Sequence, residues 1–304
     1  MIRETINPDN EAHWLELRSK DVTSSEAAAL FNLSPYCTKA ELWYRKKQND
    51  MVELESTDRM RWGNRLESVI AHGIAEDNGW TIKPKKEYMR LPEYRAGASF
   101  DFSLMAGNDT EFGLLEIKNV DGLQYKNKWI IENDVIEAPP QIELQVQHQL
   151  LVSGLPFAYI GALIGGNQVV IIKRDRDQDI IDRIKGELNL FWMSIEESTP
   201  PPFDFKNDID LISRLHGYAE PGTVGVATDR IAELAEVYRS ASEEMKRAEE
   251  KKDAAKAELL TLIGAAEKVK GFDFTISSGL VGPTKVSYER SGYRQFKINW
   301  RKMA

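Results

Sequence analysis

The pattern of apolar and polar positions predicts two β-hairpins in the first two thirds of the chain. Residues 97–104 and 112–118 alternate as strands do, and a segment rich in turn formers, 106–110, separates them. A second hairpin is expected from 157–164 and 168–173, which flank a turn containing two glycines. In both cases the connection is short enough to pair neighbouring strands.

Segments with a helical period lie before, between and after these hairpins. Residues 23–26 and 38–41 have the sequence of capping boxes, which open helices. A longer helix is predicted from residue 58 to residue 78, because Gly79 is placed as a C-terminal stop. Two further helices are expected at about 139–153 and 177–196. Strands mixed with helices, with the first hairpin central, predict an α/β core.

The proline run at 200–202 is the expected domain boundary. It divides the chain into a domain over 1–205 and an accessory region over 206–304. Within the second part, 228–266 is charged, and its sparse apolar positions favour a helical hairpin or a short coiled coil. The tail from 271 to 300 is interpreted as a small β unit.

Composition is typical of a globular protein: of 304 residues, 42% are hydrophobic and 29% are charged. The single cysteine, Cys37, excludes an internal disulfide and fits a reducing compartment. No secretory signal opens the chain, and Gly154, Pro156 and Gly161 interrupt its most apolar stretch, 150–165. We therefore expect a cytoplasmic protein without a membrane span. The net charge of −8 argues against nonspecific coating of nucleic acid but is compatible with a local basic channel.

The first hairpin carries the candidate chemistry. If it folds symmetrically about Asn108-Asp109, Asp101 lies opposite Glu116, with Cβ atoms roughly 4.5–5.5 Å apart. Glu116 and Lys118 would share one face, while Ile117 points into the core. Two carboxylates at that distance repel each other unless a cation lies between them, and Mg²⁺ is a suitable hard cation. The alternative is a solvated strand face with weak salt bridges; spacing alone does not decide between the two.

A stripe of hydrogen-bonding side chains is predicted on the helix over 139–153. Gln141, Gln145, His148 and Gln149 fall on one face at helical spacing. Amide groups on one stripe are suited to binding polar groups. For His148 alone, a surface position or a hydrogen-bonded core position is the simpler interpretation.

Five short motifs follow one another over residues 10–195. They are Glu16-Leu17-Arg18 with Thr23-Ser24-Ser25-Glu26, Trp62-Gly63-Asn64-Arg65-Leu66-Glu67, Asp101, Leu115-Glu116-Ile117-Lys118, and Gln145-Val146-Gln147-His148. In this order they resemble the lambda exonuclease family, also called YqaJ-type viral recombinases, of the PD-(D/E)XK nuclease superfamily. The resemblance implies that superfamily's nuclease core, a central mixed β-sheet flanked by helices, with the helical and small β regions as a C-terminal extension. Phe100 stands where the family usually has a proline.

The resemblance implies a metal site on the first hairpin. Asp101, Glu116 and the backbone carbonyl of Ile117 would bind Mg²⁺, for which Mn²⁺ is expected to substitute. Lys118 would orient or deprotonate the attacking water, with a pKa lowered by the neighbouring cation and by partial desolvation. Leu91 stands where the family has a further acidic residue, so one metal is expected with a second bound weakly or differently.

Further roles follow from the same resemblance. Glu67 would hold metal-bound water, and Gln145 would position water or phosphate. Arg18 and Ser25 would hold a 5′-terminal phosphate. Met60 would act as an apolar wedge that splits the terminal base pair.

Together these roles imply a Mg²⁺-dependent 5′-to-3′ exodeoxyribonuclease on linear double-stranded DNA. It would leave 3′ single strands for phage-type recombination by single-strand annealing. The resemblance also implies a homotrimeric ring around DNA and a single-strand annealing protein as partner. Two alternatives stay open: a structure-specific or restriction-type endonuclease of the same superfamily, and a non-catalytic recombination adaptor that recruits partners through 239–256.

Overall fold

The computed structural model describes residues 2–48, 57–106, 111–133, 135–285, 287, 294–296 and 298. The chain divides into two compact units, Met1–Ile212 and Ser213–Ala304. This division falls seven residues beyond the expected boundary at 205/206, inside the short helix α8 (Ile209–Leu215).

The segment after the proline run belongs to the first unit because it packs there. Phe203 stacks on Tyr44 with ring centroids 6.0 Å apart. Asp208 is buried and accepts a hydrogen bond of 2.5 Å from the hydroxyl of Thr38. The proline run therefore follows a helix without ending the unit.

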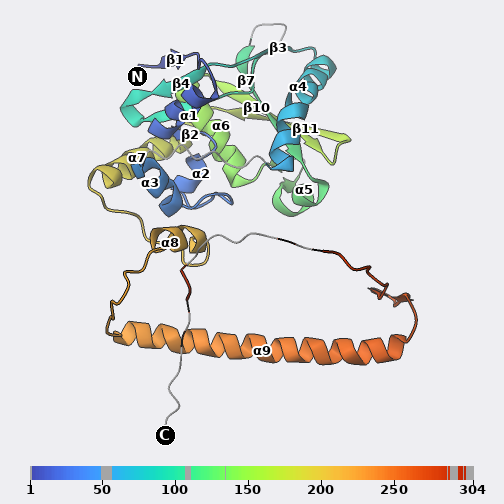
Figure 1. The fold of residues 1–304 in the computed structure, drawn as a ribbon. Coiled ribbons are helices and arrows are strands. Elements are labelled where there is room, and N and C mark those ends of the chain that lie inside the picture. The colour runs from blue at the N-terminus through green and yellow to red at the C-terminus, as the bar shows by residue number, and fades with distance from the viewer. Residues whose placement is uncertain are drawn as a thin grey trace. The chain divides into compact units, whose positions relative to one another are not determined.

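A mixed five-stranded sheet lies at the centre of the first unit (Figure 1). Its strand order is β11 (Gln168–Asp175), β10 (Phe157–Ile164), β7 (Glu111–Val120), β6 (Phe102–Ala106) and β3 (Thr81–Pro84). Strands β7 and β10 run parallel, whereas the other neighbours are antiparallel. The expected α/β class with a mixed sheet is confirmed.

A second, four-stranded sheet is built from very short strands. Its order is β1 (Glu4–Ile6), β4 (Tyr88–Leu91), β5 (Ala96–Ala98) and β2 (Val22–Thr23). Helices surround the two sheets: α1 (Glu11–Lys20), α2 (Ala27–Leu30), α3 (Lys39–Gln48), α4 (Asp58–Asn78), α5 (Gly122–Lys128), α6 (Pro140–Ser153) and α7 (Gln178–Glu196). The turn η1 (Pro92–Tyr94) and the hairpin of β8 (Ile130–Glu132) with β9 (Val135–Glu137) complete the unit.

Helix α4 covers one face of the five-stranded sheet. The Thr57 hydroxyl accepts from the Met60 amide at its N-terminus, and Gly79, at φ 64°, ends it in the left-handed conformation that glycine favours. Ile70 and Ile74 pack in one apolar cluster with Ile117 of β7. Since strand side chains alternate, Glu116 must face the other side of the sheet, where α6 packs.

The sequence predicted one continuous strand over 97–104, but this prediction is wrong, because the structure has two separate strands there. Residues 96–98 form β5 in the four-stranded sheet, and Phe102–Ala106 form β6 in the five-stranded sheet. Between them, residues 99–101 carry the chain from one sheet to the other. Asp101 therefore lies at the junction of the two sheets, immediately before β6.

The second unit contains one long helix, α9 (Asp229–Ile263), and a hairpin of β12 (Lys268–Lys270) with β13 (Thr275–Ser277). The alternative of a helical hairpin is wrong, because α9 is one uninterrupted helix, within which there is no glycine or proline to turn the chain. Of the thirty residues of the tail interpreted as a β unit, ten lie outside the described residues. No helix in the described part of the chain is long and apolar enough to cross a membrane.

Candidate active site

The register of β6 and β7 sets the spacing of the two acidic residues. Phe102 pairs with Leu115, which places Asp101 level with Glu116, as expected from a hairpin symmetric about 108–109. The turn itself lies outside the described residues. Pairing with β6 ends at Leu115, and beyond it the Ile117 amide donates a hydrogen bond of 2.7 Å to Oδ2 of Asp101. The Asp101 side chain thus takes the place of the next strand residue.

Glu116 is buried, with 3% of its surface exposed, and is held by three donors. Lys118 Nζ and Gln145 Nε2 each lie 2.5 Å from Oε1, and Gln149 Nε2 lies 2.7 Å from Oε2. Lys118 also donates to Oε1 of Gln145, at 3.1 Å. The structure therefore brings together Asp101, Glu116, Lys118 and Gln145, in a partly buried network centred on Glu116 rather than on a solvated strand face.

Charge repulsion within this network changes the protonation of its acids. Burial, together with the negative charges of Glu116 and Glu67, raises the pKa of Asp101 well above its usual range, against the opposing effects of Lys118 and the Ile117 amide. Burial and the charge of Glu116 also raise the pKa of Glu67. The site therefore holds more negative charge than its own lysine neutralises.

Lys118 differs from the expectation for a general base. Burial alone would lower the pKa of Lys118, but the carboxylates of Glu116 and Asp101 outweigh it and raise the pKa. In the chain by itself, Lys118 is thus held as an ammonium ion that neutralises Glu116. The lowered pKa expected from the resemblance is not found in this arrangement.

The donor set fits Mg²⁺. Two repelling carboxylates favour a divalent cation, and oxygen ligands are those that Mg²⁺ prefers. Oε1 of Gln149 is buried without a hydrogen-bond partner among the described residues, so the site has an excess of oxygen acceptors. No three His, Cys, Asp or Glu side chains in the described ranges are grouped as metal ligands. The remaining ligands would therefore be backbone carbonyls, such as that of Ile117, and water.

A cavity of about 540 Å³ lies beside the acids. Asp101 and Glu67 line it, although they come from different elements, and Lys85 and Lys86 contribute positive charge to the same wall. Its other lining residues are Pro8, Asn10, Glu11, Trp14, Ser68, Pro84, Ser99, Phe100 and Phe102. A cavity that combines carboxylates with lysines can take a phosphate and a cation together.

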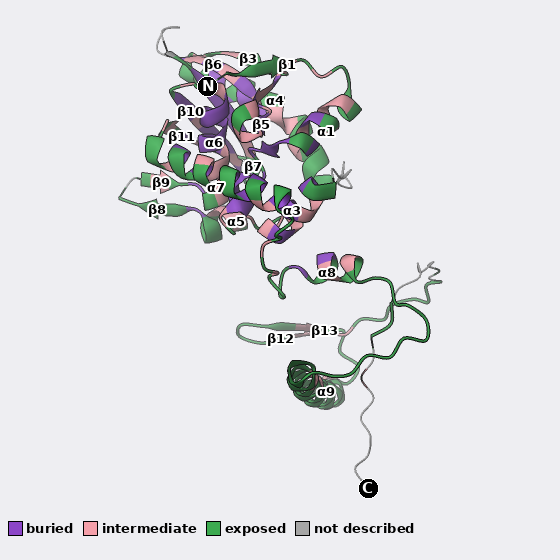
Figure 2. Ribbon diagram, turned by 90° about the vertical axis from the view of Figure 1, so that its left-hand side faces the viewer, coloured by how far each residue is buried: buried purple, intermediate pink, exposed green. Residues whose placement is uncertain are grey.

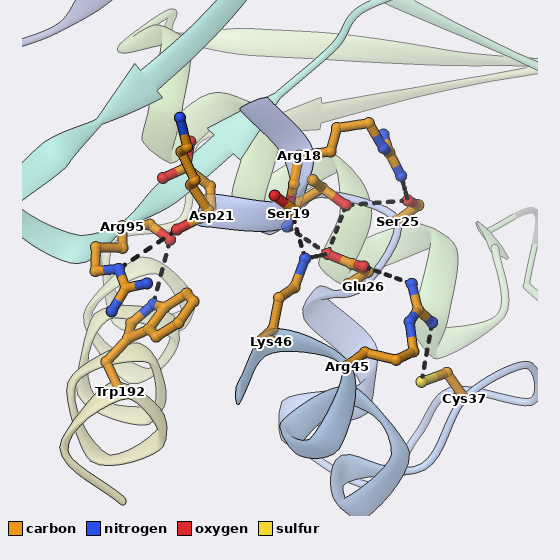
Figure 3. A network of polar contacts seen from close by, with 12 residues as sticks. Arg18, Ser19, Asp21, Ser25, Glu26, Cys37, Arg45, Lys46, Arg95 and Trp192 are labelled. Carbon is orange, nitrogen blue, oxygen red and sulfur yellow. Dashed lines mark hydrogen bonds and ion pairs between the residues drawn. The ribbon is translucent and has the colours of Figure 1, made fainter. Parts of the chain in front are cut away.

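The corner between α1 and α2 places Arg18 beside Ser25. One guanidinium nitrogen of Arg18 lies 3.3 Å from the Ser25 hydroxyl, and its Cζ atom lies 4.5 Å from the ring centre of Trp14. Figure 3 shows the buried Glu26 carboxylate between Lys46 and Arg45, beneath this pair.

Glu26 remains ionised in this corner. Although its burial opposes ionisation, the cations of Lys46, Arg18 and Arg45 lower the pKa of Glu26 to about 2. Its Oε2 also accepts from the Thr23 amide at 2.9 Å, which fixes the turn before α2. Glu26 thus holds the backbone beneath Ser25 in place.

Two sets of contacts join this corner to the acidic site. Trp14 Nε1 donates to the Ser99 hydroxyl at 2.9 Å, and Gln149 Nε2 lies 3.2 Å from the Ser99 carbonyl oxygen. The Ser24 hydroxyl is 3.0 Å from Nδ1 of His148, which is fully buried on α6. Both routes pass through α6, whose amides also hold Glu116.

Other predicted residues have different surroundings. Met60 lies in the first turn of α4 with 43% of its surface exposed, about 10 Å along the helix from Glu67. Leu91 is fully buried in β4, so this position supplies no ligand for a second metal. Sequence reasoning missed Gln149 as a site residue, although its position four residues after Gln145 placed it on the same stripe. Lys85 joins the site through a fold that its local sequence does not reveal.

Residues 13–156 match the family model of the YqaJ-like viral recombinase domain. The uncharacterized protein YqaJ of Bacillus subtilis (strain 168) is 32% identical over 182 residues, which are 59% of this chain and 54% of YqaJ. The chain thus spans about half the length of this curated relative.

Two solved structures of an alkaline exonuclease, LHK-Exo, are also similar. The enzyme from Laribacter hongkongensis has 18% identity and a TM-score of 0.48, over 67% of this chain and 99% of its own. Its complex with dAMP has 18% identity and a TM-score of 0.47, over 67% and 97%.

The matched segment includes both the acidic network and the Arg18 corner. Asp101, Glu116, Lys118 and Gln145 lie within it, as do Arg18, Ser25, Met60 and Glu67. The similarity to the YqaJ-like viral recombinase domain therefore covers both parts of the candidate site.

Proposed function

We propose that this protein is a Mg²⁺-dependent exodeoxyribonuclease that digests the 5′ strand of linear double-stranded DNA. One observation carries the proposal: Asp101, Glu116 and Lys118 meet in a partly buried network beside a cavity that Lys85 and Lys86 help to line. The neighbouring carboxylates of Asp101 and Glu116 repel each other, a divalent cation between them would relieve this repulsion, and phosphodiester hydrolysis can use such a cation.

Each residue of this site would have its own role in hydrolysis. Mg²⁺ bound by Asp101, Glu116 and the Ile117 carbonyl would supply positive charge to the scissile phosphate. The cation would replace Lys118 as the partner of the Glu116 carboxylate. The freed Nζ of Lys118 would then orient the attacking water. The Gln145 amide, already within reach of Lys118, would hold the phosphate or the water in line. Glu67 would accept a hydrogen bond from water across the cavity.

Arg18 and Ser25 favour an enzyme that acts on DNA ends. A guanidinium and a hydroxyl 3.3 Å apart match the oxygens of a terminal phosphate. Trp14, beneath the guanidinium, limits its motion. In this proposal Met60 separates the terminal base pair as the 5′ strand enters.

The proposed product is a 3′ single strand, the substrate of annealing-dependent recombination in the cytoplasm. A homotrimeric ring would keep an acidic protein on DNA, because a closed ring retains the duplex without strong charge attraction. A single-strand annealing protein would then take up the exposed strand.

Digestion of end-labelled linear duplex and of closed circular DNA tests the proposal, with Mg²⁺ or EDTA present. We expect Mg²⁺-dependent loss of the linear DNA alone, faster from 5′-phosphate than from 5′-hydroxyl ends. Nicking of the circle would replace the exonuclease with the endonuclease alternative. Absence of cleavage by folded protein would favour the adaptor.

A further inference from the structure

Helix α9 has an apolar seam along its whole length. All of its residues are described and none of them is buried (Figure 2). Positions spaced alternately three and four residues apart are apolar, except for one lysine. They are Ile231, Leu234, Tyr238, Ala241, Met245, Ala248, Lys252, Ala255, Leu259 and Leu262. This spacing is that of the a and d positions of a coiled coil.

The seam is open to solvent at both ends and in the middle. Ile231, Met245 and Leu262 are 54%, 68% and 76% exposed. Phe296 of the same unit contacts Tyr238, with ring centroids 5.5 Å apart, yet Tyr238 remains 53% exposed. An exposed row of this kind, about 46 Å long from first to last position, is typical of an interaction surface.

We propose that α9 pairs with α9 of a second copy of this chain as an antiparallel coiled coil. In that arrangement a positions face d positions of the other helix. The layers would pair Ile231 with the partner's Leu262, Leu234 with the partner's Leu259, Tyr238 with the partner's Ala255, Ala241 with the partner's Lys252, and Met245 with the partner's Ala248. Each of the three inner layers sets a large side chain against alanine, as close packing of two helices requires.

Charge selects the antiparallel direction. Beside the seam, Glu244 would lie near the partner's Lys251, and the two-fold axis repeats this attraction. A parallel pair would instead set Glu244 against the partner's Glu249 and Lys251 against the partner's Lys256. It would also stack Lys252 on the partner's Lys252 in the core. Flanking charges set the orientation of coiled coils, and here all three parallel contacts are repulsive.

This pairing is independent of the proposed nuclease function. It adds a two-fold contact outside the YqaJ-like domain. If the nuclease domains form rings, the α9 pairs would join two rings. The partner is therefore a second copy of the same chain, recognised by the complementarity of this helix with itself.

A matched pair of variants tests the pairing in the full chain. Ala255→Asp places a charge in the seam, whereas Ala257→Asp places the same charge two residues away on the outer face. By light scattering, we expect Ala255→Asp to halve the particle mass and Ala257→Asp to leave it unchanged. Equal masses for the wild type and both variants would overturn the pairing, as would a loss of mass in both.

Cysteine crosslinking tests the direction of the helices. In a Cys37→Ser background, Ala241→Cys combined with Lys252→Cys should give a covalent dimer on oxidation. The two positions are about 16 Å apart in one helix, so they cannot bridge within a chain. Lys252→Cys alone should remain uncrosslinked. Efficient crosslinking by that single variant would establish the parallel arrangement and overturn the proposal, and so would failure of both to crosslink.

Discussion

Gln149 donates a hydrogen bond of 2.7 Å from Nε2 to Oε2 of Glu116, joining α6 to the centre of β7. The same nitrogen lies 3.2 Å from the carbonyl oxygen of Ser99, two residues before Asp101. One amide thus contacts the carboxylate of one proposed metal ligand and the backbone that carries the other. The separation of the two carboxylates depends on this amide as well as on the strand register.

Glu116→Gln is expected to abolish cleavage, since it removes a charge that Mg²⁺ requires. We expect the rate to fall at least about hundredfold, with the fold retained. Glu132→Gln, on the exposed strand β8, provides the control and should cleave as the wild type does. The measurement is digestion of linear duplex DNA, alongside a thermal melt. Wild-type activity in Glu116→Gln would remove this hairpin from the chemistry.

Gln149→Leu should weaken the binding of Mg²⁺, and so raise its half-saturating concentration, without changing a proposed metal ligand. It leaves one Glu116 oxygen without its amide donor, and such outer contacts typically contribute about 10- to 100-fold in metal affinity or activity. Titration of activity with Mg²⁺ measures the shift in the half-saturating concentration. Gln141→Leu, at the start of the same helix, should leave that concentration unchanged. An equal shift in both variants would mean that α6 responds as a whole.

Arg18→Ala should lower the preference for 5′-phosphate ends. Loss of a charged hydrogen bond, about 1.5–3 kcal/mol, corresponds to roughly a 10- to 100-fold reduction in kcat/KM on phosphorylated ends. Cleavage from 5′-hydroxyl ends should be nearly unaffected. Lys20→Ala, which removes a surface ion pair with Glu16, is the control. If Arg18→Ala slowed both kinds of end equally, Arg18 would support the fold rather than bind the phosphate.

Stability should fall as the pH drops from about 6.5 to about 4, because His148 is buried in its neutral form. Burial lowers the pKa of His148 to about 4, whereas the unfolded chain takes up the proton near 6.5. The unfolded state therefore binds more protons in this window, and His148 accounts for a loss on the order of 3 kcal/mol across it. Urea unfolding from pH 4 to 7 measures the slope, which His148→Gln should reduce. Identical slopes would contradict the assignment.

Gly97→Ala and Gly73→Ala should change stability in opposite directions. A Cβ at Gly97 would lie 1.8 Å from the Tyr88 hydroxyl, which is itself bonded to the buried Asp21. Such a clash costs about 1–3 kcal/mol. At Gly73, inside α4, a Cβ meets nothing within 4 Å, so alanine should stabilise by up to about 1 kcal/mol. Denaturant midpoints of both variants measure the difference.

Local signals predicted α4 to the residue, because its limits depend on the Thr57 cap and the Gly79 stop. They also predicted the alignment of Asp101 with Glu116, since a symmetric hairpin requires it. They failed between Gly97 and Phe102. Apolar alternation continues through that segment, and the break arises only because two sheets meet there.

Sequence patterns did not predict the long-range contacts. Lys85 and Glu67 line one cavity because β3 and α4 converge on Asp101, and no periodicity encodes that approach. The strands of the four-stranded sheet have two to four residues each, too few to show a period. In α9, the seam was not predicted from the sequence because three of its ten positions are alanine and one is lysine.

The junction at residues 99–101 has a thermodynamic consequence. Ser99 is bonded to Trp14 on one side and to Gln149 on the other, and Trp14 supports Arg18. In the proposed nuclease, a DNA end that shifted Arg18 and Trp14 would displace the same backbone that positions Asp101. Binding of the end and binding of the cation would then be linked, and linkage is reciprocal, so each would change the affinity of the other by the same factor. If the end favoured the arrangement of Asp101 that binds the cation, such an enzyme would cut poorly wherever no end is bound, which would protect intact chromosomes.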